Sequence, residues 1–177
     1  NGYIKYMGDG ENVSRTLEYA YDDWCIAMAA QKLGKTEDYN YFIKRAQNYK
    51  NLYDASTGFM RPKQDAFMTP FDPYRVDHNY TEANAWQYSF YVPQDISGHI
   101  KLLGGKDKLA AFLDSIFNTT SKLTGKKQPD ISGMIGQYVH GNEPSHQIAY
   151  EYNYAGQPWK TQHMVRRIMN EMYHDKP

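Results

Sequence analysis

The segment HGNEPSH, residues 140–146, places three titratable side chains close together where the backbone has to bend. His140, Glu143 and His146 follow one another at intervals of three residues, with a glycine and a proline among them. Histidine and glutamate bind zinc in metalloproteases, but those ligands stand on one continuous helix in the order H-E-x-x-H or H-x-x-E-H. Because glycine and proline disfavour such a helix, the segment argues against a zinc site.

Two interpretations of Glu143 remain open. In the first, Asn142 caps a helix, Glu143 is its first residue, and Pro144 follows without losing a hydrogen bond. In the second, the bend is an active-site loop that presents a general acid. A helix N-terminus favours an ionised carboxylate, whereas a general acid must hold its proton near neutral pH. The second interpretation therefore needs desolvation or a nearby anion around Glu143.

The segment EYAYDDW contributes three further acids. Glu18 and Asp22 are four residues apart and project from one face of a helix, with Asp23 adjacent. On a solvated face such acids repel one another at little cost. If they face inward, they need a partner such as sugar hydroxyls, a metal ion or Arg15.

The segment DHNYTEANAWQY, residues 77–88, mixes carboxylate, amide and indole groups around Glu82, Asn84 and Trp86. A polyol pocket needs this mixture, because the polar groups donate and accept hydrogen bonds at fixed angles while a ring gives the sugar a flat surface. Thr81 has the simpler interpretation of a helix cap.

A last candidate group lies in YNYAGQPWKTQ, residues 152–162, where Trp159 and Lys160 are suited to ligand contact. The alternative is a corner between two helices. Aromatic residues make up 15% of the chain, and for most of the tyrosines an aromatic core between helices is the expected role.

Hydrophobic periodicity predicts about seven helices and no alternating strand pattern, so the fold class is all-α. Ser14 is suited to begin the first helix, Gly34 to close it, and Pro93 to end or kink the third. A turn and a short extended piece are expected over residues 54–63. The predicted helices span residues 14–35, 36–54, 81–92, 95–105, 106–123, 143–156 and 157–174.

The bulk properties limit the partners of this 177-residue chain. Its 20 basic and 20 acidic residues balance, which gives no electrostatic case for binding nucleic acid or an anionic membrane. No apolar run is long enough to span a bilayer. Cys25 is the one cysteine, so no internal disulfide is possible.

Four stretches carry a resemblance to a known family: residues 16–39, 45–63, 80–95 and 130–162. Together they resemble the exo-acting α-mannosidases of glycoside hydrolase family 92, over essentially the whole chain. The resemblance implies an (α/α)6 barrel packed against an N-terminal β-sandwich domain. It also implies release of terminal α-linked mannose, commonly α-1,2, with inversion and with dependence on calcium.

The resemblance also implies roles for residues. Glu143 matches the general acid of the family's HGNEP motif, and the DDW and EANAWQY motifs resemble pocket-lining positions. We leave the metal ligands open, with Glu82, Asn84 and Asn142 as candidates that offer the oxygen atoms Ca²⁺ prefers. The expected substrate-binding residues are Asp22, Asp23, Trp24, Glu82, Asn84, Trp86, His140, Asn142, His146, Trp159 and Lys160.

The chain departs from the family pattern in two ways. The general-base Asp that inversion requires belongs to a motif that we expect downstream of residue 177, and His146 is followed by Gln147 where the family often has a second histidine. We therefore expect residues 1–177 to be one segment of the helical catalytic domain, lacking the β-sandwich domain and the C-terminal part of the barrel.

Several expectations follow for this segment. Its partners would be a mannose-containing glycan and the rest of its parent chain. Alone it would be inactive, and it would self-associate through apolar surface meant for the missing helices. The family suggests a periplasmic or secreted parent. The alternative from a different class is a non-catalytic helical module that binds carbohydrate or serves as a scaffold.

Overall fold

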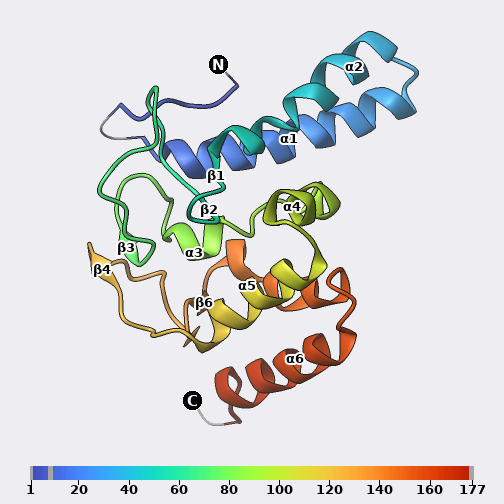
Figure 1. The fold of residues 1–177 in the computed structure, drawn as a ribbon. Coiled ribbons are helices and arrows are strands. Elements are labelled where there is room, and N and C mark those ends of the chain that lie inside the picture. The colour runs from blue at the N-terminus through green and yellow to red at the C-terminus, as the bar shows by residue number, and fades with distance from the viewer. Residues whose placement is uncertain (1, 8–9, 176–177) are drawn as a thin grey trace.

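The computed structural model describes residues 2–7 and 10–175, and most of its regular structure is helical (Figure 1). No described helix is both long enough and apolar enough to cross a membrane. The helices are α1 (Asn12–Lys32), α2 (Thr36–Arg45), η1 (Asn48–Leu52), α3 (Ala85–Tyr88), α4 (Ile96–Leu103), α5 (Lys106–Asn118), η2 (Glu143–Ser145), η3 (Ile148–Asn153) and α6 (Pro158–Met172), where η denotes a 3₁₀ helix.

The first two helices form the antiparallel hairpin that the sequence predicts, along one side of the molecule (Figure 1). Gly34 has φ of 69°, a left-handed conformation that suits glycine, and the N–H of Lys35 returns to the carbonyl of Ala30 at 2.9 Å. Gly34 therefore closes α1 as predicted.

The start of α1 differs from the prediction that Ser14 is its cap. The helix begins at Asn12, and the carbonyl of Asn79 accepts from the N–H of Val13 at 3.1 Å, so a neighbouring loop satisfies the helix end. Ser14 lies inside the first turn, where its hydroxyl accepts a hydrogen bond from the N–H of Thr81 at 2.7 Å.

The third helix is much shorter than the predicted span of residues 81–92, and Thr81 does not cap it. Asn84 is the N-cap: its side-chain oxygen accepts from the N–H of Trp86 at 3.0 Å, while Gln87 Oε1 accepts from the N–H of Asn84 at 2.7 Å. The helix ends after one turn, ahead of Pro93.

Residues 143–156 were expected as one helix, and that prediction is wrong. They form the two 3₁₀ segments η2 and η3, and the N–H of His146 bonds the carbonyl of Glu143, three residues back, at 3.0 Å. Pro144 stands inside the first segment and has no N–H to give, which favours a short, tight turn over a continued α-helix.

Within the described residues, six two-residue strands join the loops, although the sequence showed no strand pattern. β1 and β2 form the turn and extended piece expected over residues 54–63; β3 pairs with β4 in parallel, and β5 with β6 antiparallel. Such short ladders leave no alternation to read. They are β1 (Tyr53–Asp54), β2 (Phe59–Met60), β3 (Arg75–Val76), β4 (Thr124–Gly125), β5 (Met134–Ile135) and β6 (Tyr138–Val139).

An aromatic core lies among α3, β2 and α5. The rings of Phe90 and Phe112 stack with centroids 4.5 Å apart, and Trp86 meets Phe59 edge to face at 4.9 Å. Four tyrosines are among the largest fully buried side chains and serve the core as expected: Tyr49, Tyr88, Tyr138 and Tyr152. Others are exposed: Tyr19, Tyr41, Tyr150, Tyr154 and Tyr173.

The side chain of Gln137, fully buried between β5 and β6, connects three loops. Its Oε1 accepts from Asn84 Nδ2 at 2.8 Å, and its backbone carbonyl accepts from the amide of Gln87. Its own Nε2 donates to the carbonyls of Thr120 and Lys122, at 2.7 and 3.2 Å. We call this set the Gln137 clamp.

Candidate active site

A pocket of about 330 Å³ brings together three of the carboxylates that the sequence singled out. Glu18 comes from α1, Glu82 from the loop before α3, and Glu143 from the start of η2. We call this pocket the Glu143 pocket; the described residues that line it are Glu18, Thr81, Glu82, Tyr88, Tyr91, Asn142, Glu143 and Pro144.

Glu143 is exposed at this pocket on a loop with a braced base. The N–H groups of His140 and Gly141 bond the carbonyls of Gly133 and Ser132, at 2.9 and 3.0 Å. A Cβ on Gly141 would lie 2.1 Å from the hydroxyl of Ser132 and 3.0 Å from its backbone carbonyl oxygen, so a side chain at this position would force Ser132 to move. The loop is therefore fixed immediately before it delivers Glu143.

The side chain of Asn142 does not cap a helix; it links the two loops that carry Glu82 and Glu143. Its Nδ2 donates to the backbone carbonyl of Glu82 at 3.0 Å, and it makes no side-chain cap bond to η2. Glu82 has φ of 52°, an uncommon conformation for a residue with a side chain, while its carboxylate is exposed. Such local strain is typical of functional sites.

A hydrogen bond from a buried phenol fixes the carboxylate of Glu18. The hydroxyl of Tyr88 donates to Glu18 Oε1 at 2.7 Å, and Tyr88 is only 1% exposed. Burial raises the pKa of Tyr88, and the neighbouring Glu18 carboxylate raises it further. The pKa of Tyr91 is also raised, first by burial and then by Glu18. Both tyrosines therefore remain neutral hydrogen-bond donors.

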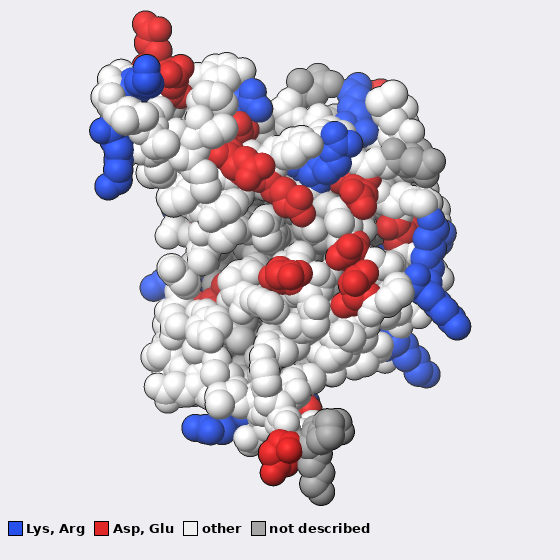
Figure 2. Space-filling model, turned by 180° about the vertical axis from the view of Figure 1, so that it is seen from behind, with Lys and Arg blue, Asp and Glu red and all other residues white. Residues whose placement is uncertain are grey.

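The charge of the Glu143 pocket has one sign. Among the described residues, its lining holds three carboxyl groups and neither lysine nor arginine. Figure 2 shows, more broadly, a face of the molecule with acidic side chains across its middle and most basic ones toward its edges. Such a lining disfavours an anionic ligand and suits the hydroxyl donors of a neutral polyol.

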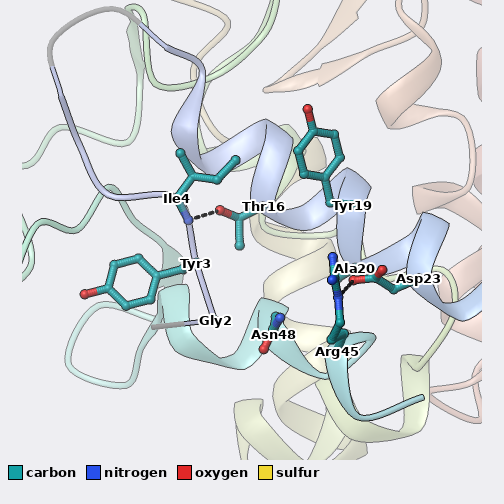
Figure 3. Close-up of a pocket in the computed structure, with 9 residues that line it drawn as sticks. All are labelled: Gly2, Tyr3, Ile4, Thr16, Tyr19, Ala20, Asp23, Arg45 and Asn48. Atoms are coloured by element: carbon teal, nitrogen blue, oxygen red, sulfur yellow. Dashed lines mark hydrogen bonds and ion pairs between the residues drawn. The ribbon is translucent and has the colours of Figure 1, made fainter. Parts of the chain in front are cut away.

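Asp22 and Asp23 of the DDW motif lie on different sides of α1, because consecutive residues on a helix point about 100° apart. Asp22 is exposed, four residues from Glu18. Asp23 is buried and pairs with Arg45 Nε at 3.0 Å, in a second cleft of about 470 Å³ (Figure 3). Trp24 is half-buried and stacks on Tyr21 at 6.1 Å. Asp22, Asp23 and Trp24 do not line the Glu143 pocket.

Asn84 and Trp86 are buried outside the lining of the Glu143 pocket. Both ends of the Asn84 amide are engaged, by Trp86 and by the Gln137 clamp, and its side chain is fully buried. Trp86 is 7% exposed within the aromatic core. Neither lines the Glu143 pocket in this structure.

His140 and His146 lie beside another cavity, of about 420 Å³, lined mainly by tyrosines and apolar side chains. His140 stands between the hydroxyls of Tyr138 and Tyr173, with its ring nitrogens 2.9 and 2.7 Å from them. Burial, and then the nearby His146, lowers the pKa of His140. The histidines flank the Glu143 loop but do not enter its pocket.

Trp159 and Lys160 are remote from the lining of the Glu143 pocket. Trp159 is 61% exposed at the start of α6. Lys160 Nζ contacts both carboxylate oxygens of Asp114, at 2.8 and 2.6 Å, and Tyr152 donates to the same carboxylate at 2.9 Å. Lys160 is thus already paired with an acid on α5.

Sequence reasoning missed the aromatic wall of the pocket. It placed Tyr88 in a pocket-lining motif but not among the substrate-binding residues, grouped Glu18 with the DDW acids without assigning it to the site, and did not consider Tyr91. One signal was available: Tyr88 and Tyr91 are three residues apart, a spacing that can bring two rings to one side of a turn.

The three candidate calcium ligands do not form a complete site. The Asn84 amide is engaged on both sides, whereas Asn142 Oδ1 and the Glu82 carboxylate remain available. Among the described residues, no group of three or more His, Cys, Asp or Glu side chains is arranged to hold a metal ion. These residues alone therefore do not fit a calcium cage.

Comparison with known proteins gives consistent matches. The family model "Glycosyl hydrolase family 92 catalytic domain" matches residues 1–177. A family GH92 α-mannosidase of Bacteroides thetaiotaomicron, solved with mannoimidazole, is 43% identical with a TM-score of 0.89, over 99% of this chain and 24% of that one. A family GH92 inverting mannosidase of the same bacterium is 36% identical with a TM-score of 0.84, over 97% of this chain and 25% of that one.

A curated relative extends the likeness to a fungus. A protein of Arthroderma benhamiae described as an uncharacterized secreted glycosidase is 30% identical over 89% of this chain and 22% of its own length. The chain thus spans about a quarter of the relatives that it matches. The predicted family and the all-α fold class are confirmed. How the remaining barrel closes stays a prediction.

Proposed function

Because the chain belongs to glycosyl hydrolase family 92, we propose that it supplies the acid side of an α-mannosidase active site, with Glu143 as general acid. The observation that carries the proposal is the Glu143 pocket, where an exposed carboxylate on a braced loop faces two other acids, an amide and two tyrosines. The two solved relatives, an α-mannosidase and an inverting mannosidase, support the same activity.

In the proposed reaction Glu143 protonates the departing glycosidic oxygen. Inversion needs a second carboxylate that activates water on the opposite face of the sugar, with about 6.5–9.5 Å between the two carboxyl groups. We place that base, an Asp, outside residues 1–177. Glu18, Glu82 and Asn142 would hold the sugar hydroxyls, and the ring of Tyr91 would face the sugar's C–H groups.

The finer properties are also proposals. We propose specificity for α-1,2 linkages and dependence on calcium, whose ligands would have to come largely from outside this chain. A periplasmic or secreted location of the parent is supported by the fungal relative, which is described as secreted.

The test uses the full-length protein that contains these residues. Glu143→Gln should lower kcat/KM on an α-1,2-mannobioside about 10²- to 10⁴-fold, the range for general acid catalysis. On an α-mannoside whose leaving group needs no protonation the loss should be small. Glu171→Gln, an exposed carboxyl on α6, is the matched control and should leave both rates unchanged.

Two outcomes would contradict the proposal. Equal losses on both substrates would assign Glu143 to binding or to the start of η2. Mannose binding without hydrolysis by the wild-type protein would instead favour the non-catalytic carbohydrate-binding module.

A further inference from the structure

Two acids on α1 meet different partners. Asp23 is buried against the guanidinium of Arg45, which balances its charge. Glu18, on the other side of the same helix, lines the Glu143 pocket, and its one hydrogen-bond donor among the described residues is the neutral hydroxyl of Tyr88. A carboxylate can accept several hydrogen bonds, so Glu18 keeps acceptor capacity for the pocket.

The hydroxyl that holds Glu18 is itself rigidly placed. Tyr88 packs between the rings of Tyr80 and Tyr91, with centroids 6.2 and 5.8 Å away. Its backbone belongs to α3, which the Gln137 clamp ties to the loops behind. One oxygen of Glu18, Oε1, is therefore fixed at 2.7 Å from a buried donor, which sets the direction of the whole carboxylate.

The side chains around Glu18 offer its carboxylate few hydrogen-bond donors. The other acidic side chains that line the pocket are those of Glu82 and Glu143, and no described lysine or arginine lines it. Like charges at close range repel. Water supplies donors when the pocket is empty, and a sugar that displaces this water must supply them from its own hydroxyls.

We propose that Glu18 is a specificity-determining residue: it accepts a hydrogen bond from one hydroxyl of the sugar bound in the Glu143 pocket, with Tyr88 as its positioning residue. This inference rests on the proposed function, since it places the sugar in the same pocket. It adds a requirement for one particular hydroxyl, independent of the linkage that is cleaved.

The test measures kcat/KM of the full-length protein on 4-nitrophenyl α-mannoside and on its 2-, 3-, 4- and 6-deoxy analogues. Removing a hydroxyl that bonds a carboxylate should cost the wild type about 10- to 100-fold for one analogue, the range for hydrogen bonds to charged groups. In Glu18→Ala that analogue and the parent mannoside should react at nearly equal rates. The discrimination among the other analogues should not change.

Two further variants keep the test decisive if Glu18→Ala fails to fold. Glu18→Gln retains a neutral acceptor, and Tyr88→Phe removes the positioning hydroxyl, so both should reduce the same discrimination in part. An unchanged deoxy profile in every folded variant would overturn the inference, because a structural role lowers all rates together. If the Glu143→Gln result holds while this profile fails, only the role of Glu18 is lost. If Glu143→Gln shows no dependence on the leaving group, the proposed function fails first.

Discussion

Glu151 should make the protein less stable as the pH rises. This residue of η3 is 1% exposed, and neither of its carboxylate oxygens has a hydrogen-bond partner in the described part of the chain. Burial raises its pKa well above the ordinary value of 4.5. The folded state therefore holds a proton that the unfolded chain releases once the pH passes about 4.5.

The magnitude follows from proton linkage. At pH values below the pKa of Glu151 in the unfolded chain, both states bind the proton. The ionisation of Glu151 then does not change the free energy of unfolding. Above it, each pH unit over which the folded state keeps the proton lowers the free energy of unfolding by about 1.4 kcal/mol. The penalty stops growing once the pH exceeds the folded pKa.

Glu151→Gln tests this reasoning, because glutamine has the shape of a protonated glutamate and does not titrate. The free energy of unfolding, from urea denaturation of the protein at pH 5, 6 and 7, should favour the variant. Its advantage should grow with pH, by at most about 1.4 kcal/mol per pH unit. Glu37→Gln, at an exposed position on α2, controls for the change in net charge. An advantage that stays flat across this range would refute the reasoning, since Glu151 would then ionise in the folded state.

Three other predictions concern stability, calcium and the isolated chain. Asp54 and Arg61 form a buried ion pair, with side chains 9% and 7% exposed, so Arg61→Met should cost about 3–5 kcal/mol in a urea titration; a cost below about 1 kcal/mol would show that Asp54 finds another partner. Since hydrogen bonds from Ser56 and Arg61 outweigh burial and lower the pKa of Asp54, this contribution should be lost as the pH falls below about 4. A chelator should abolish mannoside hydrolysis by the full-length protein and added Ca²⁺ should restore it, whereas full activity after dialysis against chelator would exclude calcium dependence. The purified 177-residue chain should release no mannose and should elute as oligomers, because Tyr150, Trp159 and Tyr173 are more than half exposed; mannose release or a monomeric elution would contradict the corresponding half of this prediction.

The hairpin of α1 and α2 could be predicted because its signals are local. Apolar residues recur at helical spacing, and Gly34 adopts the conformation that ends a helix. The residues that cap the helices were harder to predict, because Ser14, Thr81 and Asn84 are all of types suited to an N-cap. The choice of Asn84 depends on Gln137, which lies 53 residues away and satisfies the rest of its amide.

The sequence predicted the kind of site, but only some of the residues that form it. Glu82, Asn142 and Glu143 do meet at one pocket, whereas Asn84, two residues from Glu82, turns inward to the clamp. A motif gives the order of its residues along the chain, but the side on which each lies depends on φ, and Glu82 has an uncommon positive value. Glu18 lines the pocket only in the folded chain, where Tyr88, 70 positions away, donates a hydrogen bond to it.

The Gln137 clamp has a consequence for binding affinity. Its amide engages the α3 cap and two carbonyls of the loop after α5, while the backbone of the same hairpin leads directly into the Glu143 loop. The walls that carry Glu82 and Glu143 therefore share one base and cannot open independently. Their separation is set when the chain folds, so the entropy of ordering these walls is lost before the sugar arrives and is not subtracted from the binding free energy.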